Sequence, residues 1–167
     1  MDHLWSPWRY KYLTGAREPA GCVFCRIAAS PDDDENHLVV LRGAQNFVVL
    51  NRYPYTSGHL MVVPYAHESQ LGAISPECAT EMMLLARTAE MKLRAVYKPD
   101  GMNLGMNLGE SAGAGIAGHL HLHVLPRWAG DTNFMTTVAE ARVLPEELPV
   151  TLRRLRAALE EADKEQL

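Results

Sequence analysis

Three histidines alternate with apolar residues in the segment 119–125, which reads His-Leu-His-Leu-His-Val-Leu. Successive side chains of an extended strand point to opposite faces, so this spacing places His119, His121 and His123 together on one face. Imidazole titrates nearer to neutral pH than any other unperturbed side chain, and it also binds metals. The pattern therefore predicts a strand that carries a nucleophile, an acid/base group or a metal ligand.

A loop of small residues comes directly before the histidines. Residues 107–118 read NLGESAGAGIAG. The backbone N–H groups of such a loop can approach an anion closely, because few side chains stand in the way. A loop of this kind followed by a strand of histidines indicates chemistry on a phosphate group.

Two other interpretations compete with phosphate chemistry. A half-buried strand can carry histidines on its wet face by chance. Alternating histidines can also chelate a hydrolytic zinc ion, but such sites usually include a nearby carboxylate. The acidic residues near the triad in sequence are Glu110 and Asp131, and neither lies inside the segment of histidines.

The segment 119–125 resembles the signature of the histidine-triad (HIT) family, His-φ-His-φ-His-φ-φ, in which φ is apolar. The resemblance covers about residues 20–135. It includes GCVFC at 21–25, NRYP at 51–54, GHLMVVP at 58–64, His67 and NLG at 107–109. Residues 4–9 (LWSPWR) and 126–135 (PRWAGDTNFM) look like the bacterial branch of diadenosine-tetraphosphate phosphorylases or hydrolases.

This resemblance implies a covalent mechanism. In the family the middle histidine, here His121, attacks the α-phosphorus and forms a phosphoramidate, because phosphate oxygens do not repel a neutral imidazole. Its second nitrogen must donate to an acceptor, commonly a backbone carbonyl, and this bond fixes the tautomer. By position, His123 and His59 are expected to line the same pocket and to donate hydrogen bonds to the phosphate oxygens.

The resemblance also assigns the nucleotide contacts. Ala114, Gly115 and Ile116 in the small-residue loop are expected to offer N–H donors to the phosphate. Asn51 falls where the family binds ribose hydroxyls, and Asn107 falls where it contacts the phosphate region. A turn-forming role at a strand end is the alternative for both asparagines.

Two features bear on the group that accepts the nucleotide. Many family members carry a serine or threonine near Gly115 or Ile116, and phosphorylase-like members often have a Gly-Ser pair where this chain has Ala114-Gly115. In this chain a hydroxyl contact with the phosphate must come from Ser111 or be absent. We therefore expect hydrolysis or unselective transfer. Trp128 has two interpretations: it stacks on a base or closes the leaving-group side of the pocket, or it packs at an interface. Arg127 is interpreted either as catalytic or as surface charge.

A second cluster predicts a structural zinc ion. Cys22 and Cys25 form a Cys-x-x-Cys pair, and zinc-bearing family members have two further ligands at the positions of His67 and His119. Two thiolates and two imidazoles make a closed tetrahedral site, which is structural rather than catalytic. A cysteine pair without metal is the alternative. A zinc-ribbon binding module would need a second cysteine pair and a basic face.

Composition agrees with one cytoplasmic domain. The chain has 167 residues, of which 47% are hydrophobic, and three are cysteines. An odd and small number of cysteines suggests a reducing compartment. The net charge of −4 argues against a nucleic-acid partner, which needs a basic face. No apolar run approaches the length of a membrane span, and we expect no membrane partner.

Hydrophobic periodicity predicts a single α+β domain. The resemblance implies that it is a HIT-like domain over 1–167, with a core at about 20–135, an N-terminal arm at 1–19 and a C-terminal helical extension at 136–167. We expect a mostly antiparallel five-stranded sheet, one long helix and one C-terminal helix. The predicted strands are 38–41, 47–50, 59–63, 102–107 and 119–125. The long helix runs from Pro76 to Tyr97 and is stopped by Pro99 and Gly101.

The expected function is a nucleotidyl hydrolase or transferase that acts on adenine nucleotides or dinucleoside polyphosphates such as diadenosine tetraphosphate. The alternatives are a nucleoside phosphoramidase, which shares the triad, and a catalytically quiet nucleotide-binding or scaffold protein. As the resemblance implies, helix 76–97 and strand 102–107 should form the interface of a homodimer and leave no open sheet edge there.

Overall fold

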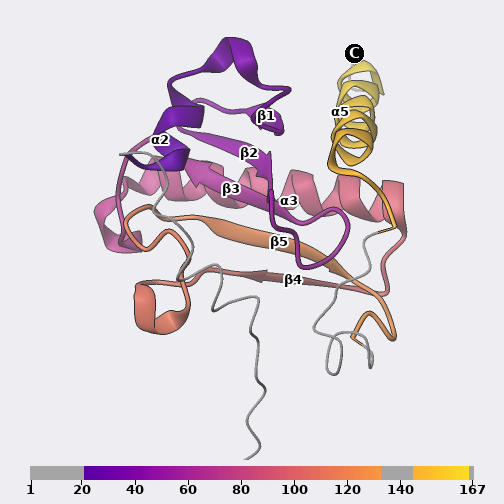
Figure 1. Cartoon of the computed structure of the whole chain (residues 1–167). Coiled ribbons are helices and arrows are strands. Elements are labelled where there is room, and N and C mark those ends of the chain that lie inside the picture. Colours follow the sequence, from indigo (N-terminus) through magenta and orange to yellow (C-terminus); the bar gives the residue numbers. More distant parts are fainter. Residues whose placement is uncertain (1–20, 133–144, 166–167) are drawn as a thin grey trace, which may run out of the picture.

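The computed structural model describes residues 21–132 and 145–165, and its centre is an antiparallel sheet of five strands (Figure 1). The strands are β1 (Val39–Arg42), β2 (Asn46–Leu50), β3 (Leu60–Pro64), β4 (Gly101–Gly105) and β5 (Leu122–Arg127). Their order is β1-β2-β3-β5-β4, so β5, which follows the first two histidines, is paired on both sides. The predicted α+β fold is confirmed.

The long helix α3 (Pro76–Tyr97) has the predicted bounds. The Ser75 side chain caps its first turn by accepting the Cys78 N–H at 3.1 Å, and a proline at the first helical position needs no N–H partner. Lys98 ends the helix in a left-handed conformation with φ of 48°. The buried face of α3 repeats at three- and four-residue steps, through Cys78, Met82, Ala86, Ala89 and Leu93.

Alternation along β5 and the residues before it separates two hydrophobic cores. Leu120, Leu122 and Val124 pack in the core between the sheet and α3. The opposite face of the sheet is covered by a short helix, α2 (Val23–Ala28), whose Phe24 and Ile27 form the second core with residues of β2 and β3. Because both faces are covered, every residue of β2 and β3 is buried.

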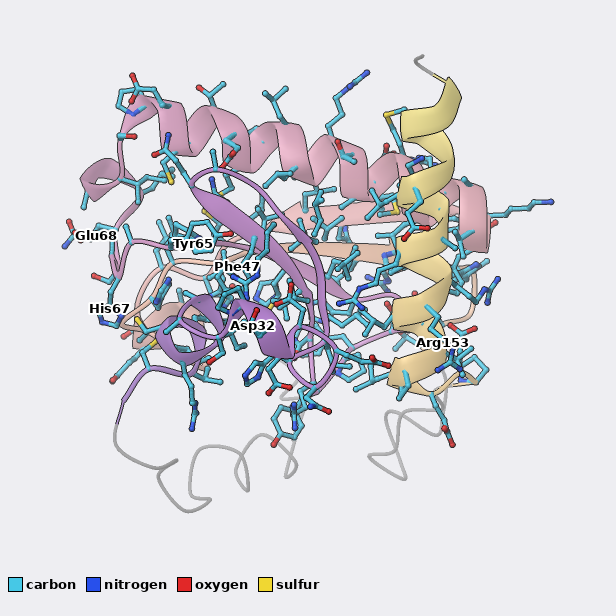
Figure 2. All side chains as sticks on the ribbon, turned by 90° about the horizontal axis from the view of Figure 1, so that it is seen from above. Asp32, Phe47, Tyr65, His67, Glu68 and Arg153 are labelled. Carbon is cyan, nitrogen blue, oxygen red and sulfur yellow. The ribbon has the colours of Figure 1, made fainter. Side chains whose placement is uncertain are left out.

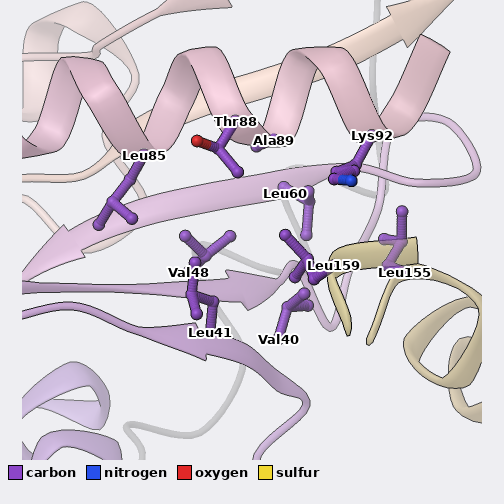
Figure 3. Close-up of a pocket in the computed structure, with 10 residues that line it drawn as sticks. All are labelled: Val40, Leu41, Val48, Leu60, Leu85, Thr88, Ala89, Lys92, Leu155 and Leu159. Carbon is purple, nitrogen blue, oxygen red and sulfur yellow. The ribbon is translucent and has the colours of Figure 1, made fainter. Parts of the chain in front are cut away.

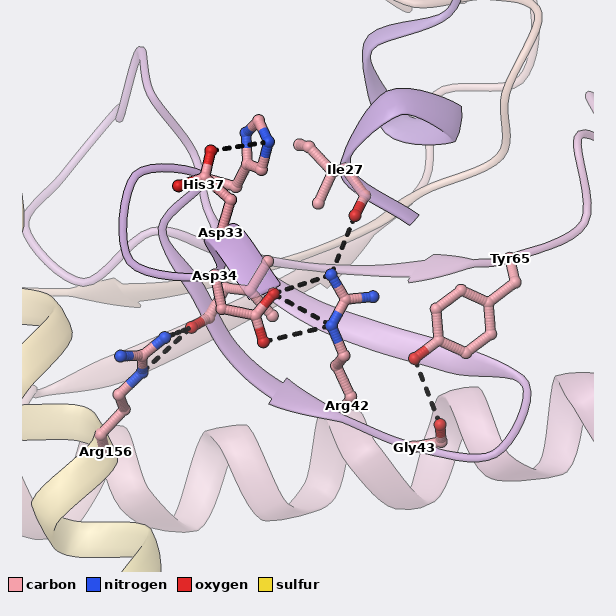
Figure 4. Close-up of polar contacts among 9 residues, drawn as sticks. Ile27, Asp33, Asp34, His37, Arg42, Gly43, Tyr65 and Arg156 are labelled. Carbon is pink, nitrogen blue, oxygen red and sulfur yellow. Dashed lines mark hydrogen bonds and ion pairs between the residues drawn. The ribbon is translucent and has the colours of Figure 1, made fainter. Parts of the chain in front are cut away.

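Two arginines fasten peripheral elements to β1 (Figure 4). Arg42 donates to the Asp34 carboxylate and, through Nη2, to the Ile27 carbonyl at 2.8 Å, which ties the last turn of α2 to the sheet. Arg156 on the C-terminal helix α5 (Leu148–Glu165) donates to the Val39 carbonyl, where the pairing of β1 with β2 is interrupted. α5 also packs against α3 (Figure 1).

The strand bounds differ slightly from those predicted. The first three strands are displaced by about one residue, and β4 and β5 end or begin differently from 102–107 and 119–125. β5 begins at Leu122 because the preceding N–H groups bond elsewhere: that of His119 donates to Ile116 and that of Leu120 to Glu68. β4 accordingly ends opposite His123, at Gly105.

The rest of the predicted organisation is partly outside the described residues. The N-terminal arm 1–19, the motif 4–9, the end of the predicted core at 133–135 and residues 136–144 of the C-terminal extension lie there, whereas the helical part of that extension is α5. Among the helices that the structure describes, none is long and apolar enough to cross a membrane.

Candidate functional site

The four predicted zinc ligands converge at one end of the sheet. The Sγ atom of Cys22 is 3.3 Å from Nδ1 of His119, and the Sγ atom of Cys25 is 3.2 Å from Nδ1 of His67. The two Nδ1 atoms are 3.2 Å apart, and all four ligand atoms lie within 4.8 Å of one another. Figure 2 shows His67 and Glu68 at the edge of the molecule away from Arg153 on α5.

These separations match a tetrahedral zinc ion. Zinc bonds of about 2.3 Å to sulfur and about 2.0–2.1 Å to nitrogen imply edges of about 3.6 Å between sulfur and nitrogen and about 3.4 Å between two nitrogens. Three of the four sulfur–nitrogen distances here are 3.2–3.6 Å, and the distance between the two nitrogens is 3.2 Å. The donor set therefore fits zinc in both chemistry and spacing, and these four residues form a candidate metal centre.

A backbone contact prepares His119 for this role. Its Nε2 lies 2.9 Å from the carbonyl oxygen of Pro64, at the end of β3. A carbonyl can only accept, so Nε2 carries the proton and Nδ1 keeps its lone pair for the cluster. A metal-binding histidine commonly donates its other N–H in this way.

His121 sits one step further along the same face, with the geometry expected of the predicted nucleophile. Its Nδ1 donates to the carbonyl of His119 at 2.8 Å, which leaves the lone pair on Nε2. Nε2 has no hydrogen-bond partner within the described part of the chain. Burial lowers the pKa of His121, although the hydrogen bond to His119 opposes this shift. The ring is therefore neutral at pH 7 and has its lone pair on the nitrogen left for a substrate.

His123 and His59 form a pair, with His59 behind His123. Nε2 of His59 is 2.9 Å from Nδ1 of His123, and the backbone N–H of Tyr55 donates to Nδ1 of His59 at 3.1 Å. Because His59 Nδ1 accepts, its Nε2 carries the proton and donates to His123. His123 then presents an Nε2–H donor. Burial, followed by the nearby His121, lowers the pKa of His123 to about 4.

This arrangement differs from the expectation that His59 contacts the phosphate oxygens directly. His59 is 0% exposed and both of its ring nitrogens contact protein atoms. The sequence places His59 and His123 on the same face of paired strands, but only the packing of the 51–58 segment shows that one ring lies behind the other. In this geometry His59 lies behind His123, and the part that either residue takes in a reaction stays a prediction.

The two asparagines are engaged in local structure. Oδ1 of Asn51 accepts the Tyr53 N–H at 2.9 Å, which closes an Asx turn, and its Nδ2 is 3.4 Å from His59. Nδ2 of Asn107 points to the carbonyl of Gly113 at 3.5 Å and so spans the small-residue loop. These contacts agree with the turn-forming alternative, while contacts of either residue with a nucleotide stay predictions.

The small-residue loop offers backbone donors near the triad. Gly109 and Gly113 have φ of 84° and 90°, a conformation that favours glycine. The N–H of Ala114 donates to Gly109, whereas the N–H groups of Gly115 and Ile116 donate to no acceptor in the described ranges. Two of the three predicted donors therefore remain for an anion.

Trp128 and Arg127 lie away from the histidines. A strand rises about 3.3 Å per residue, so the five steps from His123 to Trp128 cover roughly 16 Å along the chain. Arg127 pairs with the Asp131 carboxylate and Asn103, and its guanidinium holds the pKa of Asp131 at about 2. The structure does not place Arg127 among the triad residues. Both interpretations of Trp128, contact with a base or the leaving group and packing at an interface, stay predictions.

Sequence reasoning missed two aromatic side chains at the site. Phe24 is 2% exposed, and its ring centroid is 5.3 Å from that of His121 and 5.4 Å from that of His119. The ring of Tyr55 lies 4.7 Å from that of His59. The sequence did contain a signal for Phe24. It lies between the two predicted zinc ligands Cys22 and Cys25, so a short helix held by these ligands must place Phe24 near the cluster.

An apolar hollow elsewhere in the described part of the chain is not part of this site. It lies between the sheet, α3 and α5, and is lined mainly by aliphatic side chains such as Val48, Leu60 and Leu155, with Thr88 and Lys92 at its rim (Figure 3). The triad histidines lie on the other face of the sheet, against α2. The hollow has no group that could perform the chemistry indicated by the sequence, so we assign the functional site to the α2 face.

Comparisons with known proteins agree with the signature and the fold. The HIT domain family matches residues 34–130. The chain is 41% identical to a protein named AP-4-A phosphorylase from Mycobacterium tuberculosis, over 93% of this chain and 83% of the relative.

Solved structures give the same assignment. A Zn-bound histidine triad family protein from Mycobacterium smegmatis superposes with a TM-score of 0.70 at 30% identity, over 86% of this chain and 96% of that one. A hypothetical histidine triad nucleotide-binding protein from Sulfolobus tokodaii superposes with a TM-score of 0.68 at 25% identity, over 84% of this chain and 93% of that one. The chain belongs to the HIT family.

Proposed function

We propose that this protein is a HIT-type nucleotidyl hydrolase or transferase that cleaves the α-phosphate linkage of adenine (di)nucleotides such as diadenosine tetraphosphate. The observation that carries the proposal is the tautomer of His121, which is fixed by the carbonyl of its own triad neighbour. The relative named AP-4-A phosphorylase supports the substrate class.

The reaction begins with attack by Nε2 of His121 on the α-phosphorus. A bond forms between Nε2 and phosphorus, and the bond between phosphorus and the bridging oxygen breaks with its electron pair leaving on that oxygen. His121 becomes a cationic nucleotidyl-imidazole whose Nδ1–H stays on the His119 carbonyl. Water or inorganic phosphate then attacks the same phosphorus. The bond between phosphorus and Nε2 breaks, and its electron pair returns to Nε2 of His121.

His123 and the loop are assigned to the oxygens on which charge accumulates. The Nε2–H of His123 donates to the leaving side, and the N–H groups of Gly115 and Ile116 donate to the non-bridging oxygens. Asn51 is assigned to the ribose, and Asn107 orders the loop. His59 holds His123 in the donor tautomer, because its own Nδ1 is occupied by the Tyr55 N–H.

The low pKa of His123 favours a polyphosphate over an amine as the leaving group. A terminal phosphate group has a pKa of about 6, so it departs without needing a proton at pH 7. The amine of a phosphoramidate must be protonated before it leaves. His123, with a pKa of about 4, is almost entirely unprotonated at pH 7 and therefore seldom carries that proton. We therefore rank the dinucleoside polyphosphate above the phosphoramidate.

Zinc is proposed as the structural metal, held by Cys22, Cys25, His67 and His119. When bound, it supplies only fixed geometry, since two thiolates and two imidazoles leave no open position for substrate. The Zn-bound relative supports this assignment.

A homodimer is proposed through α3 and β4. Met83, Leu84 and Met91 are 50–57% exposed on α3, and β4 is an edge strand. Leu104, 43% exposed, pairs with Val124 and so lies on the α3 side of the sheet. An apolar helix face beside an open strand edge fits a second copy of the chain.

Two observations point to different acceptors. The relative's name includes phosphorylase, whereas Ala114 and Gly115 provide no hydroxyl near the phosphate. We retain the expectation of hydrolysis or unselective transfer. The test is product analysis with diadenosine tetraphosphate, with and without inorganic phosphate: AMP with ATP in both cases supports it, and dominant ADP with ATP when phosphate is present contradicts it.

A parallel assay separates the proposed function from its alternatives. Faster turnover of an AMP-lysine phosphoramidate than of diadenosine tetraphosphate would identify a phosphoramidase. Tight AMP binding with no turnover of either compound would identify a quiet binding protein and would overturn the proposal.

A further inference from the structure

The candidate metal centre and the predicted nucleophile share one residue. The imidazole of His119 belongs to the cluster, while its backbone carbonyl accepts the Nδ1–H of His121 at 2.8 Å. The His119 ring is 1% exposed and its second nitrogen is bonded to Pro64. The orientation of His121 thus depends on His119, which also contacts the other residues of the cluster and the Pro64 carbonyl.

A second connection runs through Phe24. This residue lies between the ligands Cys22 and Cys25, and its ring lies against both His119 and His121. α2 has only six residues, too few to form a stable helix without tertiary contacts. Arg42 holds its last turn through the Ile27 carbonyl. At its other end the cysteine side chains contact the two histidines of the cluster.

A single zinc ion would join four donor atoms that come from three separate segments of the chain, 22–25, 67 and 119. With its Nε2–H on Pro64, His119 directs a lone pair toward His67, whose Nδ1 is 3.2 Å away. At this distance His67 can present either an N–H or a lone pair, and only the lone pair is compatible with zinc. Without a metal the four side chains lose their common partner, and a shift of the His119 backbone moves the carbonyl that orients His121.

We propose that the zinc cluster positions the nucleophile from outside the substrate pocket, through the His119 carbonyl and through Phe24, so that loss of zinc or of the Phe24 ring slows nucleotidyl transfer while nucleotide affinity persists. Phe24 is a positioning residue, since it acts through His121. The effect on rate rests on the proposed function, whereas the effect on the His121 tautomer does not.

The test compares Phe24→Leu with the matched control Phe47→Leu. Both phenylalanines are buried in the core on the α2 side, at 2% and 0% exposure, but Phe47 stacks on Tyr65, and the structure records no ring contact between Phe47 and the triad. We expect Phe24→Leu to keep its bound zinc and its KM within about twofold and to lose roughly 10- to 100-fold in kcat, because misplacing a reacting group costs this much. We expect Phe47→Leu to keep its kcat. Equal kcat losses in the two variants would show only a packing role.

A second measurement needs neither substrate nor substitution. Nitrogen NMR of the histidine rings reports whether His121 has a single Nδ1–H tautomer in the zinc-loaded wild-type protein, after chelation, and after zinc is added back. We expect one tautomer with zinc, a mixture without it, and recovery on reloading. An unchanged His121 spectrum after zinc removal overturns the proposal.

Each measurement remains informative when the other cannot be made. If Phe24→Leu does not fold, the NMR comparison of zinc-loaded and chelated protein decides. If the chelated protein unfolds, the comparison of the two variants decides. A wild-type protein that turns over no nucleotide would refute the proposed function, but the NMR comparison would still decide whether the cluster positions His121.

Discussion

Replacing His123 by glutamine should flatten the pH dependence of stability between pH 7 and pH 5. Burial lowers the pKa of His123 from 6.5 to about 4. The unfolded chain therefore binds more protons than the folded one between these values, and the free energy of unfolding falls as the pH is lowered through this window. With these two pKa values, the loss from pH 7 to pH 5 is about 2 kcal/mol for this residue alone.

Glutamine is suited to this test because its side-chain oxygen can accept the Nε2–H of His59, as Nδ1 of His123 does. Urea unfolding at pH 7, 6 and 5 should show the wild type losing about 2 kcal/mol more than His123→Gln over this range. Groups far from His123 contribute equally in the two proteins and cancel in the difference. Identical slopes in the two proteins would refute the conclusion that His123 is buried in the neutral form.

Three further predictions concern the nucleophile, the metal and the assembly. His121→Asn should reduce kcat by several orders of magnitude and leave AMP affinity nearly unchanged, because the bond-forming atom is lost while the pocket remains; near-normal turnover would exclude a covalent intermediate on this ring. Purified protein should contain about one zinc per chain by elemental analysis, and Cys25→Ser should lower that content; zinc-free wild type would remove the metal from the mechanism. Leu84→Glu should convert a dimer to a monomer in light scattering, and a wild type that is already monomeric would contradict the interface.

Much of the arrangement could be predicted from local patterns. The periodicity of helix 76–97 and its stop at Pro99 and Gly101 predicted both ends of α3 correctly, because amphipathicity and helix-breaking residues are encoded locally. The alternation of histidine and leucine predicted the two faces correctly. The four zinc ligands came from the family resemblance, and their convergence in the structure agrees with it.

The parts that could not be predicted depend on contacts between distant segments. The order of His59 behind His123 is set by how the 51–58 segment folds back, which brings the Tyr55 N–H to the ring. The late start of β5 depends on the Glu68 carbonyl, which takes the Leu120 N–H away from the sheet. Sequence spacing carries no information on either partner, because both are chosen by tertiary packing.

The alternation before and along β5 has a consequence for how such a protein can change. Leu120, Leu122 and Val124 face the core against α3, and the residues between them face the site. Within residues 119–124, selection should restrict the even-numbered positions because they maintain the fold, and the odd-numbered positions because they carry the chemistry. A laboratory library confined to odd positions could therefore explore new reactions on an intact scaffold, whereas a one-residue deletion would exchange the two sets and destroy both properties at once.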